Sequence, residues 1–452
     1  MATQDEFMRA SDAFSWYQES DPAMRATIVG VVWLDRSPDW ARLVARMEAA
    51  SRLVPRLRQR VVELPVRIAV PRWETIEDFE LSWHVRRTTG TTDEAVLELA
   101  RIEAMTGFDR ARPLWVFTLV DGLPDGRAAL LMKLHHSLTD GIGAVRLEPM
   151  VFDTVREPDF VPHPEEPPRT GDGALVTASL AHTAGQLLDL AGQAVRNAAP
   201  TALHLLRDPM GSVRTAVDTA RSIARTVAPV TDIRSPVMRA RGLGRHLDVV
   251  TVALHDLKQA AATADVTVND AFLAGVTGGM RHYHHKHDAP VDELRMTMPL
   301  SIRTADDPLA SNRITLMRFL VPVSEPDPER RMRLIDTRAK AVRNAKSLGF
   351  TDAIAAGLDL LPTGIVGGML KRVDFLASNV TGVPVALYLA GAKVTAHAAF
   401  GPTMGCAANL TLMSYNGTCH IAANLDTAAI PDADVFIDCL RMGVDEVVDV
   451  GR

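Results

Sequence analysis

The stretch Leu-His-His-Ser-Leu-Thr-Asp-Gly, residues 134–141, ends an apolar run and carries the most informative pattern in the chain. Adjacent side chains of a strand point to opposite faces, so only one of His135 and His136 can face a given cleft. An imidazole that titrates near neutrality is a suitable general base for an alcohol. Asp140 can orient that ring or support the loop, and Gly141 permits a tight turn. The pattern therefore predicts one working histidine and one that is held behind it.

The same residues also have a structural interpretation, in which a buried histidine pair ends a strand and an ordinary Asp-Gly turn follows. Apolar runs at 115–120 and 128–134 flank the turn-rich stretch 121–127 and predict a β-hairpin that ends in the motif. The motif by itself leaves both interpretations open, and the context has to decide between them.

The composition indicates a globular protein of more than one domain. The chain has 452 residues, 47% of them hydrophobic, which at about 100–200 residues per domain gives two or three domains. Its 49 basic and 55 acidic side chains leave a net charge of -6, so nucleic acid is not an expected partner. The 3 cysteines do not make a disulfide framework, and no stretch is apolar enough to span a bilayer. We therefore expect a cytoplasmic protein.

A Pro-rich, charged stretch from 157 to 173 resists helix and strand alike and predicts a linker. It suggests an N-terminal half of residues 1–156, a linker and helical crossover of residues 157–235, and a C-terminal half of residues 236–452. Because strands and helices alternate in both halves, we expect a mixed α/β fold. Strands are predicted at 26–34, 247–254, 295–298, 314–321, 394–398, 410–414 and 420–423, and helices at 40–50, 256–264, 269–283, 328–345 and 433–442.

Further motifs accompany the paired histidines along most of the chain. They are Pro113-Leu114-Trp115, Asn269-Asp270, Pro299 to Arg303, Ser311-Asn312-Arg313, Ser378-Asn379-Val380 and Ser414-Tyr415-Asn416-Gly417. With these blocks the chain resembles the bacterial wax ester synthase/diacylglycerol acyltransferase family, in the superfamily of coenzyme-A-dependent acyltransferases that includes condensation domains. The chain departs from the family at residues 381–384, Thr-Gly-Val-Pro, because Pro-Gly-Pro usually follows Ser-Asn-Val. The opening block at residues 11–14 is only approximate. These departures concern substrate preference more than the class of reaction.

The resemblance implies two chloramphenicol-acetyltransferase-like domains with a central tunnel, which acyl-CoA enters from one side and the acceptor alcohol from the other. It implies that His136 is the general base and takes the hydroxyl proton as the acceptor oxygen attacks the thioester carbonyl. Coenzyme A then leaves as a thiol, and neither an acyl-enzyme nor a cofactor is required. His135 is mainly structural, and Asp140 supports the loop through an ion pair for which Arg303 is the candidate partner. The implied acceptor is diacylglycerol or a long-chain alcohol.

Other residues of these blocks keep two interpretations. Asn269 stands where a helix N-cap is expected, so Asn269 and Asp270 either cap the helix or line the tunnel. Trp115 belongs to the core or to the substrate site, and the core is favoured. Arg303 is the partner of Asp140 or a surface arginine. The resemblance adds four substrate-binding or supporting residues: Pro113, Leu114, Ser378 and Asn379.

Two other chemistries are not expected. A group of histidines crowds the end of the 269–283 helix, but no carboxylate or cysteine joins it at ligand spacing, so basic residues at a helix C-terminus are favoured over a metal site. Its members are His282, His284, His285 and His287. Thr403 stands where the serine of a nucleophile elbow would stand in residues 401–405, which favours a loop.

Two rival functions remain open beside acyl transfer to a lipid alcohol. A lipid-binding or scaffold protein would keep the fold without the chemistry, although the intact paired-histidine motif argues against it. A condensation-type enzyme would use carrier-protein thioesters, although no carrier module is fused to the chain.

A membrane or lipid-droplet surface is a further candidate partner, because the implied substrates partition into lipid. Residues 174–229 combine an apolar stripe with arginines, which suits an anionic surface. The favoured alternative is that this segment packs onto the two halves as their crossover. The stripe consists of Leu203, Leu206, Met210, Val213 and Val217, and the arginines are Arg196, Arg207, Arg214, Arg221 and Arg225.

Overall fold

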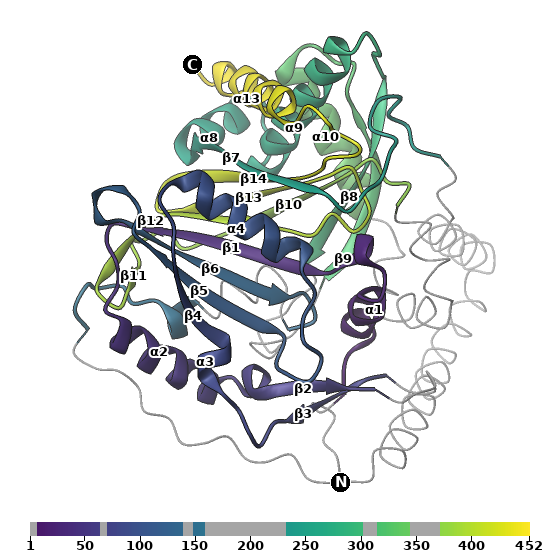
Figure 1. Ribbon diagram of the computed structural model, residues 1–452. Helices are drawn as coiled ribbons and strands as arrows, with labels where there is room; N and C mark the ends of the chain where they lie inside the picture. The colour runs from purple at the N-terminus through teal and green to yellow at the C-terminus, as the bar shows by residue number, and fades with distance from the viewer. Residues whose placement is uncertain (1–6, 64–69, 139–147, 159–231, 302–313, 344–370) are drawn as a thin grey trace, which may run out of the picture.

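A six-stranded mixed sheet dominates the N-terminal part of the molecule (Figure 1). The computed structural model describes residues 7–63, 70–138, 148–158, 232–301, 314–343 and 371–452. The first sheet has the strand order β11-β12-β1-β6-β5-β4 and is antiparallel except between β4 and β5. Its strands are β1 (Thr27–Leu34), β4 (Val85–Thr89), β5 (Trp115–Asp121), β6 (Ala128–His135), β11 (Tyr388–Leu389) and β12 (Ala392–Phe400).

A second six-stranded sheet is built from the C-terminal part of the chain and has the order β7-β14-β13-β10-β8-β9. Its central strand β10 is parallel to both neighbours, and the other pairs are antiparallel. Its strands are β7 (Arg245–Ala253), β8 (Glu293–Ser301), β9 (Ile314–Pro322), β10 (Phe375–Thr381), β13 (Ala408–Tyr415) and β14 (Thr418–Asp426). A separate two-stranded ribbon consists of β2 (Gln59–Val62) and β3 (Arg72–Thr75).

Helices cover both sheets. Those on the second sheet are α8 (Leu254–Thr263), α9 (Val268–Lys286), α10 (Pro328–Arg343) and α13 (Ala433–Val450), and they gather on its side away from the first sheet (Figure 1). Around the first sheet lie α1 (Ala10–Gln18), α2 (Trp40–Leu53), α3 (Leu81–His84) and α4 (Asp93–Met105), with the short turns η2 (Pro22–Met24), η3 (Pro55–Arg58) and η4 (Pro124–Gly126). Because α4 contacts both β1 and β7, it joins the two sheets. The expected mixed α/β fold is confirmed.

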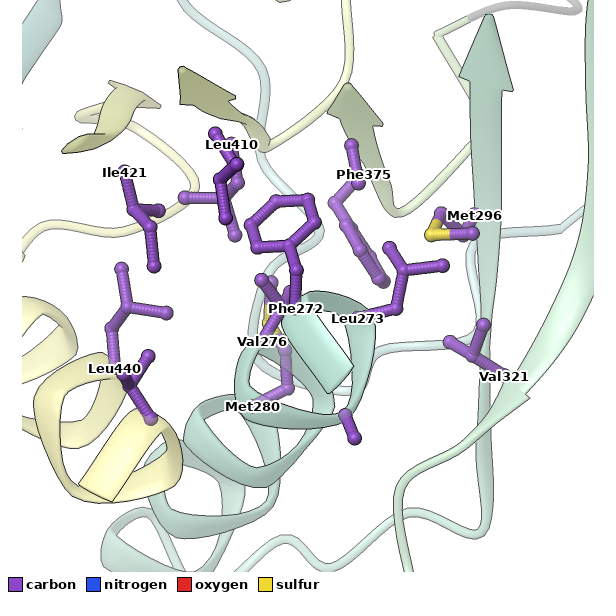
Figure 2. Packing of buried hydrophobic residues seen from close by; sticks show 14 of the residues in the cluster. Phe272, Leu273, Val276, Met280, Met296, Val321, Phe375, Leu410, Ile421 and Leu440 are labelled. Atoms are coloured by element: carbon purple, nitrogen blue, oxygen red, sulfur yellow. The ribbon is translucent and has the colours of Figure 1, made fainter. Parts of the chain in front are cut away.

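The largest core lies between α9 and the second sheet (Figure 2). Phe272, Val276 and Met280 recur at steps of about one helical turn, so they share one face of α9. Figure 2 shows this face directed at apolar side chains of the strands, which include Phe375 of β10 and Leu410 of β13. Burial of such side chains is the main favourable contribution to folding.

Two strands of the C-terminal part, β11 and β12, belong to the first sheet. β12 pairs antiparallel with β1, with Val29 opposite Phe400 and Val32 opposite His397. A division of the chain at residue 236 therefore does not separate the two sheets. The expected linker and helical crossover of residues 157–235 lie outside the described residues except at their two ends. Within the parts that the structure describes, no helix has the length and apolar character needed to cross a bilayer.

The expected hairpin is confirmed, and a second hairpin lies near the C-terminus. β5 pairs antiparallel with β6, as the apolar runs predicted. β13 and β14 are joined at Asn416 and Gly417, whose φ angles of 45° and 86° are those of a type I′ turn. The last helix is longer than predicted and continues through Gly443 to Val450, because Gly443 packs against another helix instead of ending its own.

We expect Gly443→Ala to lower the free energy of unfolding by about 1 to 3 kcal/mol, the usual effect of overpacking a core. A Cβ atom at Gly443 would lie 2.1 Å from the backbone N of Gly279, so α9 and α13 would have to separate. The matched control is Met442→Ala on the exposed side of α13, where the side chain is 45% exposed. Denaturant unfolding of the two variants checks the prediction, and equal stability of both would contradict it.

Candidate active site

Hydrogen bonds to two neighbouring strands hold the end of β6 and fix the paired histidines. The N–H of His135 donates to the carbonyl oxygen of Leu114 at 3.0 Å, and the N–H of His136 donates to that of Ala26 at 2.9 Å. Successive N–H groups of a strand point to opposite sides, so one bond reaches the β5 side and the other the β1 side. The Pro-Leu-Trp block therefore lies beside the paired histidines.

His135 is fully buried and its ring is held from every side. Its Nδ1 accepts a hydrogen bond from the N–H of Ser137 at 3.1 Å, so the ring N–H is at Nε2. That Nε2 is 3.4 Å from Oε2 of Glu19. The ring also packs edge-on against Trp16 and Phe108, with centroids 6.0 and 5.8 Å away. This environment suits a structural role.

Glu19 supports the motif, although sequence reasoning did not single it out. Its side chain is 8% exposed, and its carboxylate accepts a hydrogen bond from the N–H of Ala26 at 3.0 Å. Burial alone raises the pKa of Glu19, but hydrogen bonding and charge interaction with His135, together with the Ala26 N–H, bring it below its usual value. The carboxylate therefore stays ionised beside His135. No local sequence pattern around Glu19 predicts its long-range contact with His135.

His136 is half-buried and comes directly after β6, in whose strand the side chains of Met132 and Leu134 share the face opposite to His135. A cavity of about 40 Å³ lies against this face, with room for more than one water-sized group. Apolar side chains and a single carboxyl group line it: Met47, Ala50, Val54, Leu57, Trp115, Phe117, Met132, Leu134, Glu148, Met150 and Val151. The cavity thus lies against the face of Met132 and Leu134, and His136 follows this strand without being one of the lining residues.

Trp115 lies in the core, as the sequence favoured. Its indole N–H donates to the carbonyl oxygen of Leu57 at 2.8 Å, and its ring stacks on His84 with centroids 4.5 Å apart. Burial lowers the pKa of His84 to about 4, so this imidazole is neutral near pH 7. Trp115 is 1% exposed and belongs to the core, and it also lines the cavity.

A pair of polar residues lies buried on the face of the first sheet that carries Met132. Glu148 is 4% exposed, and burial raises its pKa to about 7. His397 of β12 is 6% exposed, and burial, with a smaller effect of His420, lowers its pKa to about 4. Nδ1 of His397 is 3.6 Å from Oε1 of Glu148. Sequence reasoning missed this pair, because its members are far apart in the chain.

We expect Glu148→Gln to change the pH dependence of stability. Between about pH 4.5 and 7 the unfolded chain loses the Glu148 proton while the folded protein keeps it, so wild-type stability falls as pH rises. The glutamine of the variant cannot ionise. We therefore expect the free energy of unfolding of the variant, relative to that of the wild type, to rise by about 3 kcal/mol across this pH range. Unfolding at pH 4.5 and pH 8 measures the gain, with exposed Glu94→Gln as the control. If the difference in the free energy of unfolding between the variant and the wild type does not vary with pH, the raised pKa of Glu148 is contradicted.

The expected N-cap at Asn269 is wrong. Thr267 is the N-cap of α9, and its hydroxyl accepts from the N–H of Asp270 at 3.3 Å. The carboxylate of Asp270 accepts in return from the N–H of Thr267 at 3.0 Å, which completes a capping box. Asn269 does not cap the helix, and its Nδ2 lies 3.6 Å from Sδ of Met298. Thr-x-x-Asp is the signal that would have found the cap.

The remaining motifs lie in the second sheet or outside the described residues. Ser378 and Asn379 are on β10, opposite Thr411 and Leu412 of β13. The hydroxyl of Tyr415 accepts a hydrogen bond from the N–H of Leu387 at 2.8 Å and donates to the carbonyl oxygen of Val394 at 3.2 Å. Because Val394 belongs to β12, this block ties β13 to the first sheet. Several motif residues fall outside the described ranges, and their roles stay predictions: Thr139, Asp140, Gly141, Ile302, Arg303, Ser311, Asn312 and Arg313.

The histidines at the end of α9 have tertiary partners that the sequence spacing did not show. His282 contacts Glu446 at 2.6 Å, and His287 contacts Asp432 at 3.1 Å. His284 is buried, and its Nε2 lies 2.8 Å from the hydroxyl of Ser235. Among the residues described, histidine, cysteine and carboxylate side chains nowhere gather in threes as a metal site would require.

Comparison with known proteins identifies the family. The model of the wax ester synthase/diacylglycerol acyltransferase catalytic domain matches residues 8–272, and that of the WS/DGAT C-terminal domain matches residues 310–447. A Mycobacterium tuberculosis protein named as a diacylglycerol O-acyltransferase is 34% identical over 442 residues, which cover 95% of this chain and 89% of the relative. Another from the same species is 26% identical over 92% of this chain and 87% of the relative.

Solved structures share the fold. The wax ester synthase/diacylglycerol acyltransferase of Marinobacter aquaeolei aligns over 99% of this chain and 100% of its own, with a TM-score of 0.63 and 18% identity. The first condensation domain of the calcium-dependent antibiotic synthetase aligns over 100% and 97%, with a TM-score of 0.64 and 12% identity. The resemblance drawn from the motifs is confirmed: the chain belongs to the wax ester synthase/diacylglycerol acyltransferase family and is an acyltransferase.

Proposed function

We propose that the protein transfers a fatty acyl group from acyl-CoA to diacylglycerol or a long-chain alcohol, with His136 as the general base. The observation that carries the proposal is the contrast between the two histidines. His135 is fully buried and hydrogen-bonded to Ser137, whereas His136 is half-buried at the end of β6, two residues after Leu134, which lines the apolar cavity.

In the proposed reaction His136 takes the proton of the acceptor hydroxyl as its oxygen bonds to the thioester carbonyl carbon. The tetrahedral intermediate then collapses, the carbon–sulfur bond breaks, and the sulfur of coenzyme A takes the proton back from His136. The step needs no acyl-enzyme and no cofactor beyond the acyl-CoA substrate.

The names of the relatives favour diacylglycerol as the acceptor, and the family also includes wax ester synthases. The test is the product profile of the purified protein with palmitoyl-CoA when hexadecanol and dipalmitoylglycerol compete. We expect triacylglycerol to predominate. Wax ester as the main product would reassign the acceptor, and no thiol release with either would favour a lipid-binding or scaffold protein.

The likeness in fold to a condensation domain favours a second candidate, an enzyme that uses carrier-protein thioesters. The same acyl group is offered as the free coenzyme A thioester and as the thioester of an acyl carrier protein. Acyl transfer from the carrier protein alone would favour this candidate.

The proposed substrates partition into lipid, so we also propose peripheral binding to an anionic membrane or droplet surface. The segment expected to bind, residues 174–229, lies outside the described residues. Each basic residue near an anionic surface contributes about 1 kcal/mol. We therefore expect co-sedimentation with anionic vesicles that falls with salt and is lost when Arg207, Arg214 and Arg221 become Glu. Unchanged sedimentation of that variant would remove this segment as the binding site.

A further inference from the structure

One carboxylate oxygen of Glu19 faces both groups that hold His136 in place. Glu19 directly follows α1, and its side chain is 8% exposed. Its Oε2 accepts a hydrogen bond from the N–H of Ala26 at 3.0 Å and lies 3.4 Å from Nε2 of His135. Among the described residues, that nitrogen has no other polar partner. A single buried oxygen thus connects the end of α1 to the start of β1 and to the end of β6.

The first connection runs through the backbone of Ala26. The N–H of Ala26 donates to Glu19, and its carbonyl oxygen accepts from the N–H of His136 at 2.9 Å. Thr27, the next residue, pairs with His135 in the register of β1 and β6. Because buried backbone groups need their partners, a displacement of Ala26 would carry the backbone of His136 with it.

The second connection runs through the ring of His135. Its Nδ1 accepts from the N–H of Ser137 at 3.1 Å, and its carbonyl oxygen accepts from the N–H of Leu138 at 2.9 Å. The bond to Leu138 closes a β-turn in which His136 is the second residue. The ring of His135 therefore braces the turn through one nitrogen, while Glu19 contacts its other nitrogen.

Glu19 itself is not placed to act as a base. Its carboxylate faces the buried ring of His135, against which Trp16 also packs, and its Oε1 lies 3.9 Å from Nε of Arg25. Burial raises the pKa of Glu19, but the contacts with His135 and Ala26 lower it more, so the carboxylate is a weak base near pH 7. Any effect of Glu19 on the reaction would therefore pass through His135 and Ala26.

We propose that Glu19 is a positioning residue of the acyl transfer, which holds the backbone of His136 from two sides so that its imidazole meets the acceptor hydroxyl. The inference rests on the proposed function in that His136 is the base. A base has to lie within hydrogen-bond reach of the proton that it takes, and a displacement of about 1 Å can cost about 100-fold in rate. The contacts of Glu19 therefore govern the rate of the chemical step and not the binding of acyl-CoA.

Three substitutions of Glu19 separate the position of its oxygen from its charge. Glu19→Ala removes the acceptor, and Glu19→Asp keeps the charge but withdraws the carboxylate by one methylene group. We expect both to lower kcat by about 10- to 100-fold, with little change in the KM for palmitoyl-CoA. Glu19→Gln keeps an oxygen that can accept from Ala26 and face His135, so it should retain most of the wild-type kcat.

The rates are measured at a temperature at which the melting curve shows each variant to be folded. If Glu19→Ala does not fold, the comparison of Glu19→Asp with Glu19→Gln carries the test. Wild-type kcat in Glu19→Asp, or a Glu19→Gln variant as slow as Glu19→Asp, would overturn the inference.

A remote glutamate provides the control for general destabilisation. Oε1 of Glu446, on α13, lies 2.6 Å from Nε2 of His282, on the side of the second sheet that faces away from the first (Figure 1). Glu446→Gln also removes a partly buried carboxylate beside a histidine, so it should lower the melting temperature and leave kcat unchanged. A fall in kcat as large as that of Glu19→Asp would show that lost stability is the cause, against the inference.

A double-variant cycle distinguishes this inference from the proposed function. If Glu19 acts through His136, Glu19→Asp should slow thiol release in the wild-type background and have no further effect in the His136→Ala variant. Slowing by the same factor in both backgrounds would overturn the role of Glu19 alone. A His136→Ala variant with the wild-type rate would instead refute the proposed function, and with it the route through His136.

Discussion

His136→Ala lowers the rate of thiol release from acyl-CoA by about 100- to 10,000-fold, the usual effect of removing a general base. The melting temperature stays near that of the wild type, because the half-buried ring at the strand end contributes less to packing than its buried neighbour. Thiol release and thermal unfolding are measured on the same preparations.

The control for this result is His255→Ala, which removes an exposed histidine from α8 and should leave the rate unchanged. The opposite pattern would reverse the assignment. A His135→Ala variant that is folded but inactive, beside an active His136→Ala variant, would show that the other ring is the base.

His135→Ala destabilises the protein by about 3 to 5 kcal/mol, since removing one partner of a buried pair leaves the other uncompensated. The uncompensated group is the Glu19 carboxylate, whose oxygen lies 3.4 Å from the lost Nε2. The Trp16 and Phe108 rings also lose the side chain between them. We expect a low soluble yield and a lower melting temperature, while exposed His285→Ala remains like the wild type.

A double variant checks this mechanism. Glu19→Gln removes the charge but keeps an oxygen that can accept from the Ala26 N–H, so it should recover part of the stability lost in His135→Ala. The opposite result is that Glu19→Gln lowers the free energy of unfolding by the same amount in the His135→Ala background as in the wild type. In that case the two residues are not coupled, and the buried pair is not the cause of the destabilisation.

The local parts of the fold and site were predictable from the sequence. Two apolar runs predict the β5–β6 hairpin, and Asn416-Gly417 is typical of the turn found between β13 and β14. The period of a strand also explains why His135 and His136 lie in different surroundings. These features depend on neighbours in the sequence, where period and turn chemistry act directly.

Long-range features were not predictable in this way. The pairing of β12 with β1 brings His397 beside Glu148 across most of the chain, and nothing in either local pattern specifies the partner. Glu148 stands in the sequence between a leucine and a proline and resembles a surface residue. The N-cap of α9 was misplaced for a different reason, because two polar residues compete near the helix start and Thr267 completes a capping box with Asp270.

The most direct test of the account is rapid mixing of wild-type protein with palmitoyl-CoA in the presence and absence of the acceptor, with thiol release followed from the first turnover. Direct transfer with His136 as base predicts thiol release only when the acceptor is present, and no release by His136→Ala. A burst of thiol without acceptor, equal in amount to the enzyme, would reveal an acyl-enzyme and contradict the account.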